Sequence, residues 1–258
     1  MKFIQIVFSP TGGTKKVADI IAEEWRETKV FADLSDAEAD PSEIVIEPED
    51  LALVAVPSYG GRVPGLAAER LSKIQGNQAR CILVCVYGNR AYEDTLVELQ
   101  DIVEKCGFRT AAGISAVAEH SIMHQYATGR PDREDAAKLR EFAGKIRERL
   151  ADEKAPQTVP GMPGNRPYKK AGGAALVPRA TKDCVNCGLC AENCPAQAIS
   201  RENLKTADPE KCISCMRCVA LCPKAARKVN SKAVSVVALA IKKACSERKE
   251  NELFLVQF

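Results

Sequence analysis

The stretch Cys184-Val185-Asn186-Cys187-Gly188-Leu189-Cys190-Ala191-Glu192-Asn193-Cys194-Pro195 separates its four cysteines by two, two and three residues and ends in proline. The same pattern returns 28 residues later, from Cys212 to Pro223. Paired runs of this kind bind two [4Fe–4S] clusters, and the fourth cysteine of each run ligates the cluster of the other run. The ligands predicted for one cluster are Cys184, Cys187, Cys190 and Cys222. Those predicted for the second cluster are Cys212, Cys215, Cys218 and Cys194.

Other uses of closely spaced cysteines fit less well. A single Cys-x-x-Cys pair also occurs in redox dithiols and in zinc sites. A structural zinc ion takes four ligands in all, which leaves the third close thiolate and the Cys-Pro ending of each run unexplained. Disulfide bonding is disfavoured because residues 1–3 lead directly into a strand pattern, without the features of a signal peptide. The clusters indicate a reducing cytoplasm and an organism that avoids oxygen.

The composition is that of a globular protein. The chain has 258 residues, of which 46% are hydrophobic and 28% charged, and a formal net charge of +3. This modest charge, without interleaved aromatic residues, argues against nucleic-acid binding, and no apolar run is long enough to span a membrane. Proline and glycine are dense over residues 152–180, which predicts a linker between two domains.

Strand and helix patterns alternate over residues 1–151. Strands are expected at residues 3–8, 30–34, 51–56, 81–86 and 113–118. Helices are expected at residues 14–26, 64–74, 91–106 and 132–150. This order predicts an α/β fold with a doubly wound, five-stranded parallel sheet. We expect a smaller α+β domain with the two clusters at residues 181–230, and a C-terminal helix and tail at residues 231–258.

Three loops follow predicted strands at the carboxyl edge of the sheet, where ligands of doubly wound folds bind. The first loop, Ser-Pro-Thr-Gly-Gly-Thr at residues 9–14, offers hydroxyls and backbone N–H groups at a helix start, which suits a phosphate held by neutral donors. It lacks the Gly-Lys-Ser/Thr ending of a Walker loop, and an ordinary capped turn is the alternative. The candidate phosphate-binding residues are Ser9, Thr11, Gly12, Gly13 and Thr14.

The other two loops set tyrosines beside glycine backbone, after the third and fourth predicted strands. The rings of Tyr59 and Tyr92 are placed to stack on a planar ligand whose polar edge bonds to the loop backbone. The alternative is that these tyrosines only cover strand ends. The candidate ring-binding residues are Ser58, Tyr59, Gly60, Gly61, Tyr87, Gly88, Asn89 and Tyr92.

Several further residues lie near the same edge. His120 follows the last predicted strand and is a candidate to donate to the ligand or relay its proton, with a structural loop histidine as the alternative. Arg62 is placed either to neutralise a reduced ligand or to face solvent. Cys81 and Cys85 lie within an apolar strand and are expected to be inert buried thiols.

Residues 1–150 resemble the flavodoxins, whose phosphate loop Ser/Thr-x-Thr-Gly-x-Thr is matched here by Ser9, Thr11, Gly12 and Thr14. The cluster half resembles the two-[4Fe–4S] ferredoxins, and the whole chain resembles the fused flavodoxin–ferredoxin proteins of anaerobic bacteria and archaea. The resemblance implies FMN as a further cofactor. Two departures from flavodoxins bear on the flavin potentials: Gly88-Asn89 stands where Gly-Asp is common, and Tyr59 takes the place of a loop tryptophan.

The sequence therefore predicts a cytoplasmic electron-transfer iron–sulfur flavoprotein that relays low-potential electrons between two [4Fe–4S] clusters and FMN, and on to a redox protein. Two alternatives remain open: an FMN-dependent reductase of a small molecule at the exposed flavin, and a dedicated reductive activase of one partner enzyme. No nucleic-acid partner and no membrane span are expected.

Overall fold

The computed structural model describes residues 1–152, 161–172 and 176–255. Within these residues the main feature is a six-stranded sheet in the order β2-β1-β3-β4-β5-β8. Its strands are β1 (Phe3–Val7), β2 (Lys29–Asp33), β3 (Leu51–Pro57), β4 (Arg80–Tyr87), β5 (Arg109–Val117) and β8 (Glu252–Phe254). The first five are parallel, which confirms the predicted α/β class, and their order is the flavodoxin-like one.

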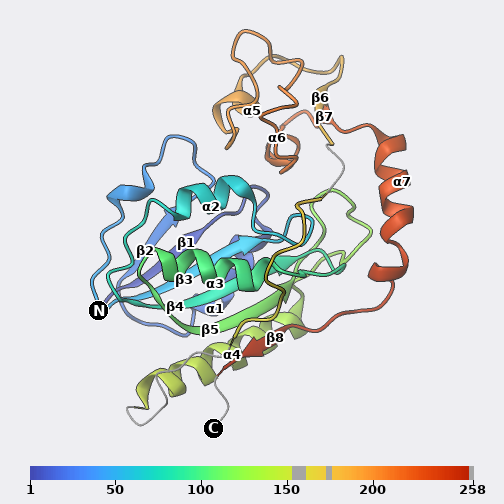
Figure 1. Cartoon of the computed structure of the whole chain (residues 1–258). Helices are drawn as coiled ribbons and strands as arrows, with labels where there is room; N and C mark the ends of the chain where they lie inside the picture. The colour runs from blue at the N-terminus through green and yellow to red at the C-terminus, as the bar shows by residue number, and fades with distance from the viewer. Residues whose placement is uncertain (153–160, 173–175, 256–258) are drawn as a thin grey trace.

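Helices cover both faces of this sheet, as Figure 1 shows. They are α1 (Gly13–Ala22), α2 (Gly65–Leu71), α3 (Thr95–Lys105) and α4 (Arg133–Ala151). Helix α1 packs against α4 on one face, and α2 packs with α3 on the other. Successive residues of β1 pack into different hydrophobic cores. Phe3 lies in the core shared with α1 and α4, and Ile4 lies in the core shared with α2 and α3. Burial of the sheet on both faces explains why the central strands have continuous apolar sequences.

The strand order reverses next to β1. Strand β2 lies on one side of β1, and β3, β4 and β5 follow on the other. The loops that leave the carboxyl ends of β1 and β3 therefore diverge to opposite faces and leave room for a ligand. The loops after β1, β3 and β4 and the segment after β5 all leave from this edge.

The C-terminal segment returns to the sheet. Helix α7 (Ser231–Ile241) occupies residues where a helix was expected, and a single 3-10 turn follows at Lys243–Cys245. The chain then adds β8 antiparallel to β5, with Glu252 opposite Ser115. The sequence predicted five strands and a tail, because a strand of three residues is too short to show a period.

Part of the predicted linker forms a strap, defined here as residues 161–172, that lies along α3. Met162 is buried, and its N–H donates to the side chain of Gln100. The carboxylate of Asp94 accepts from the backbone N–H groups of Asn165 and Lys169, at 2.8 and 2.7 Å. The remaining linker stretches at 153–160 and 173–175 lie outside the described residues.

The cysteine motifs fold into a separate small unit beyond the carboxyl edge of the sheet (Figure 1). A short antiparallel pair, β6 (Arg179–Ala180) with β7 (Arg227–Lys228), joins its two ends. Each motif contains one helical turn, α5 (Leu189–Glu192) in the first and α6 (Arg217–Ala220) in the second. Among the described residues, no helix combines the length and the apolar character that a membrane crossing requires.

Candidate functional site

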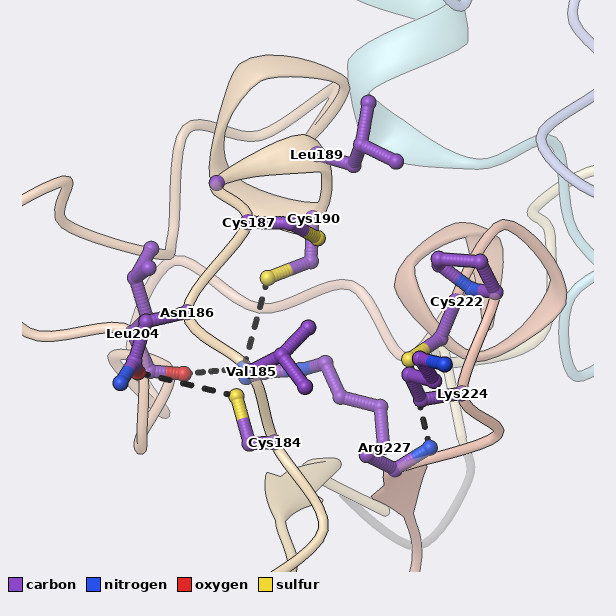
Figure 2. A pocket seen from close by; sticks show the side chains of 13 residues that line it. Cys184, Val185, Asn186, Cys187, Leu189, Cys190, Leu204, Cys222, Lys224 and Arg227 are labelled. Carbon is purple, nitrogen blue, oxygen red and sulfur yellow. Dashed lines mark hydrogen bonds between the residues drawn. The ribbon is translucent and has the colours of Figure 1, made fainter.

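Three cysteines of the first motif and one of the second surround a small cavity, shown in Figure 2. The cysteines that line it are Cys184, Cys187, Cys190 and Cys222. Cys184 and Cys187 precede α5, Cys190 lies within it, and Cys222 follows α6. Val185, Leu189 and Lys224 form further parts of the wall. The structure thus groups the fourth cysteine of the second motif with the first three of the first motif.

A second small cavity has the reciprocal composition. Its cysteines are Cys212, Cys215, Cys218 and Cys194. Ile199 and Ile213 are apolar members of its wall. Burial raises the pKa of the Cys215 thiol to about 12, so a thiolate at this position needs a positive charge beside it. An iron centre supplies such a charge.

The two motifs also share unusual backbone angles at equivalent positions. Asn186 and its repeat partner Ser214 have φ values of 53° and 52°. Gly188 and its repeat partner Met216 have φ values of 84° and 63°. Left-handed residues within a turn direct successive N–H groups toward one concave surface, where they favour an anion. Non-glycine side chains rarely take these angles, which indicates that the cysteine loops are shaped for what they enclose.

Backbone donors reach the sulfur atoms directly. The N–H of Ala198 donates to Cys194 Sγ at 3.3 Å, and that of Ala226 donates to Cys222 Sγ at 3.2 Å. Hydrogen bonds to thiolate sulfur are a main determinant of the potential of an iron–sulfur cluster. The donor set, the grouping and these bonds all fit two [4Fe–4S] clusters.

The loop after β1 presents neutral donors at the start of α1. Gly12 has a φ of 90°, which glycine adopts without strain. Ser9 Oγ accepts from the N–H of Lys15 at 2.9 Å and so closes the first turn of the helix. The two neighbouring amines are engaged elsewhere, since Lys15 binds Asp19 and Lys16 donates to the Pro131 carbonyl. The loop therefore lacks a free cation, as the sequence predicted for a phosphate held by hydroxyls and amides.

The loop after β3 makes a tight two-residue turn. Tyr59 and Arg62 exchange backbone hydrogen bonds of 3.0 and 3.2 Å. Gly60 and Gly61 between them have φ values of 61° and 84°, which side chains other than glycine rarely tolerate. A Cβ atom on Gly60 would lie 2.0 Å from the carbonyl oxygen of Gly172 at the end of the strap. This turn is therefore in direct contact with the strap.

One larger cavity, of about 600 Å³, lies at the carboxyl edge of the sheet. The predicted site residues that line it are Ser9, Thr11, Gly13, Thr14, Ser58, Tyr59, Gly60, Tyr87, Gly88 and His120. The fold thus brings all three predicted loops, and the histidine after β5, around a common space. Four predicted residues do not belong to the part of the lining that the structure describes: Gly12, Gly61, Asn89 and Tyr92.

Asn89 and Tyr92 bind the C-terminal segment instead. The amide of Asn89 donates to the carbonyls of Cys245 and Glu247, at 3.0 and 2.8 Å. The hydroxyl of Tyr92 donates to Glu252 at 2.9 Å. The expectation that Tyr92 stacks on the ligand is thus not supported. Both side chains hold the segment that leads into β8, whose path the sequence had not revealed.

His120 faces the cavity with a defined tautomer. Its Nδ1 accepts from the N–H groups of Ile122 and Met123, at 3.2 and 3.3 Å. An accepting Nδ1 leaves the ring proton on Nε2. Burial, together with the like charge of His124, lowers the pKa of His120. The side chain is therefore a neutral Nε2–H donor.

Arg62 takes neither of its two expected roles. It forms paired bonds of 2.7 and 2.6 Å with the carboxylate of Glu98. It also donates to the carbonyl of Lys169 at 2.5 Å and lies over the ring of Tyr168. Arg62 thus ties the turn after β3 to α3 and to the strap, and its charge is already compensated.

The sequence did not reveal that the cluster unit contributes to this cavity. Its second motif supplies Cys212, Ile213 and Ser214 to the wall, and α7 supplies Val237 and Ile241. Tyr126 fixes α7 by donating to the carbonyl of Ala238 at 2.7 Å. The spacing of the apolar residues 237 and 241 predicted a C-terminal helix, but it did not reveal the surface on which this helix packs.

Comparison with known proteins identifies the cysteine-rich segment. The family model of the 4Fe-4S dicluster domain matches residues 183–226, which supports two [4Fe–4S] clusters in this segment. Ferredoxin Fdx2 of Sorangium cellulosum is 42% identical over 50 residues, which are 17% of this chain and 50% of that ferredoxin. The match therefore spans half the length of this curated relative.

Solved flavodoxins are similar to the N-terminal region of the chain. A flavodoxin of Streptococcus pneumonia TIGR4 is 20% identical and covers 57% of this chain and 97% of its own, with a TM-score of 0.41. Flavodoxin 1 of Bacillus cereus is 18% identical and covers 58% of this chain and 100% of its own, with a TM-score of 0.42. By its own strand order and by the family of residues 183–226, the chain joins a flavodoxin-like α/β fold to a 4Fe–4S dicluster segment, as a fused flavodoxin–ferredoxin does.

Proposed function

We propose that the chain is an electron carrier that connects two [4Fe–4S] clusters with an FMN bound in the large cavity, and both with a redox partner protein. One observation carries this proposal: the same cavity is lined by Thr11 of the phosphate-type loop and by Cys212 and Ile213 of the second cluster motif. A cubane cluster exchanges single electrons whereas a flavin exchanges one or two, so their combination joins one-electron and two-electron partners.

The residues of the cavity suit FMN in a defined orientation. Thr11 and Thr14 lie at the start of α1, where hydroxyls and N–H groups favour the phosphate. Tyr59 and the backbone of Gly88 line the space next to it, and the Nε2–H of His120 provides a donor for a ring acceptor. Ile213, Val237 and Ile241 add apolar side chains to the lining, which lowers the local dielectric constant around a bound ligand.

The lining of the large cavity also distinguishes an inner cluster site, next to the cavity, from an outer one. The group made by Cys212, Cys215, Cys218 and Cys194 is the inner one, since Cys212 belongs to both its cavity and the large one. The other group opens to the outside: Cys187 is exposed, and Val185 beside it is 58% exposed. We propose that electrons pass between a partner protein and the flavin through the outer and then the inner cluster, in either direction.

The carrier function is favoured over a small-molecule reductase by the position of Arg62. Arg62 was a candidate to neutralise a reduced ligand, and its guanidinium is instead paired with Glu98 at 2.6 Å. The two cations in the described lining of the cavity, Arg90 and Lys169, are both paired with Glu93, at 2.9 and 2.5 Å. A small anionic substrate therefore meets no unpaired cation among them.

Cofactor content tests the proposal. The chain is purified anaerobically, iron and released flavin are measured, and the visible spectrum is followed during titration with dithionite. We expect about eight iron atoms per chain, the sum of two cubanes, and one FMN, with bleaching of a broad cluster band and of a flavin band. Iron at this level without any flavin would overturn the relay.

A further inference from the structure

A buried arginine lies in the wall of the outer cluster cavity. Arg227 is 2% exposed, and it lines this cavity together with Cys190 and Cys222 (Figure 2). Its guanidinium donates to the carbonyls of Leu204 and Pro178, at 2.6 and 3.2 Å, and to Cys190 Sγ at 3.7 Å. Its Nε has no hydrogen-bond partner among the described residues.

This environment leaves the charge of Arg227 without a carboxylate. The partners that the structure describes are two neutral carbonyls and the sulfur atoms of Cys190 and Cys218. A guanidinium removed from water is costly unless a negative charge is close to it. A [4Fe–4S] core with four thiolates carries a net charge of about −2 when oxidised and about −3 when reduced. Arg227 lines the outer cavity and is not part of the described lining of the inner one, so the outer cluster is the nearer counter-charge.

Only the second of the two repeats has an arginine at this position. The position equivalent to Arg227 in the first repeat, 28 residues earlier, is Ile199. Ile199 is buried in the wall of the inner cavity, as Arg227 is in the wall of the outer one. Lys224 in the outer wall is likewise matched by Ala196 in the inner wall, so the two sites differ by two positive charges, of which only that of Arg227 is buried.

We propose, on the basis of the cluster assignment above, that Arg227 raises the reduction potential of the outer cluster above that of the inner cluster. Reduction adds one electron to the core, from 2+ to 1+, and moves no proton, so the net charge of the site becomes more negative by one. A fixed cation stabilises the reduced form more than the oxidised form. Electrons that enter the chain therefore reside on the outer cluster, next to the partner, until the flavin accepts them.

The test is an anaerobic redox titration of the full chain with a chemical reductant and mediators, followed by EPR of the reduced clusters. The wild type is expected to show two separate cluster potentials. In Arg227→Ile, which makes the two repeats alike at this one position, the difference between the two potentials narrows because the higher potential falls. Arg227→Lys keeps the charge and is expected to keep the separation. Arg201→Gln, a loss of one exposed charge in the same unit, serves as the control and leaves both potentials unchanged.

Two results would overturn the proposal. One is coincident cluster potentials in the wild type, and the other is an unchanged separation in Arg227→Ile at full iron content. If Arg227→Ile fails to assemble its clusters, the polar variant Arg227→Gln is titrated in its place, with the same expectation. A wild type without about eight iron atoms would instead reject the cluster assignment, and the role of Arg227 with it, so iron content separates the two failures.

Discussion

Gly60 and Gly172 lie so close together that a Cβ atom on Gly60 would stand 2.0 Å from the Gly172 carbonyl oxygen. Gly60 belongs to the turn after β3 and Gly172 ends the strap. Farther along the chain, the N–H of Leu176 donates to Ser214 Oγ in the second cysteine motif. The contact therefore joins the flavodoxin-like part to the chain segment that leads to the inner cluster.

The substitution Gly60→Ala is predicted to loosen the strap. The added methyl group meets the Gly172 carbonyl, whereas in Gly107→Ala it meets only the Asn77 nitrogen at 3.8 Å. Both glycines have positive φ, of 61° and 85°, so both variants incur a backbone penalty of about 1–2 kcal/mol. Hydrogen exchange at the N–H groups of Asn165 and Lys169 is expected to accelerate in Gly60→Ala only. Equal acceleration in both variants would contradict the contact.

The substitution Thr11→Val is predicted to weaken FMN binding selectively. It keeps the shape of the side chain but removes a hydroxyl that lines the cavity. A hydrogen bond to a charged group contributes about 1.5–3 kcal/mol, so affinity is expected to fall about 10- to 100-fold. Flavin fluorescence measures this affinity, and iron content stays unchanged. Thr206→Val, in the cluster unit, is the control, and equal loss in both variants would reject the phosphate assignment.

Pairs of cysteine substitutions test the crossed ligand sets. Cys194 lines the same cavity as Cys212, while Cys190 lines the other one. The single variant Cys194→Ala is predicted to lose one cluster and keep about four irons. Adding Cys212→Ala removes no further iron, because both residues serve one cluster, whereas adding Cys190→Ala removes the rest. The opposite pattern of iron counts would show that each motif holds its own cluster.

His120 is predicted to stay neutral at pH 7 with its proton on Nε2. Its pKa lies below the ordinary value of 6.5, since burial and His124 disfavour the charged ring. Protonation thus occurs only as the pH falls below 6.5, and it removes the acceptor that holds the N–H groups of Ile122 and Met123. Removing the neighbour in His124→Ala moves the titration of His120 upward. Nitrogen NMR of these histidines, the only two in the chain, measures both effects, and a midpoint above 6.5 in the wild type would refute the prediction.

The sequence predicted what rests on strong local patterns. Continuous apolar runs such as residues 51–56 and 81–86 became the central strands β3 and β4, since burial on both faces leaves little choice of residue type. The hydroxyl-rich loop at Ser9–Thr14 was predictable for a similar reason, because it follows the first such strand and opens a helix. Cysteine spacing predicted the grouping around Cys184 and Cys222 that the cavities display.

What the sequence did not predict depends on long-range contacts. The antiparallel strand β8 is three residues long, and its position comes from Asn251, whose side chain accepts from the N–H of Val117 at 2.9 Å. The contribution of Ile213 to the large cavity arises from the docking of one unit on the other. The role of Arg62 was left open between the ligand and solvent because its partner Glu98 lies 36 positions away. No local period or motif encodes such pairings.

The central claim is that the inner cluster connects the flavin with the outer cluster, and flash reduction of the full chain tests it most directly. One electron per chain is injected, and the cluster and flavin bands are followed in the wild type and in Cys212→Ala, which lacks the inner cluster. The account predicts that flavin bleaching in the wild type follows a first-order phase independent of protein concentration, and that Cys212→Ala loses this phase while it retains FMN. Persistence of the same phase in Cys212→Ala, or a rate that rises with protein concentration, would contradict the relay.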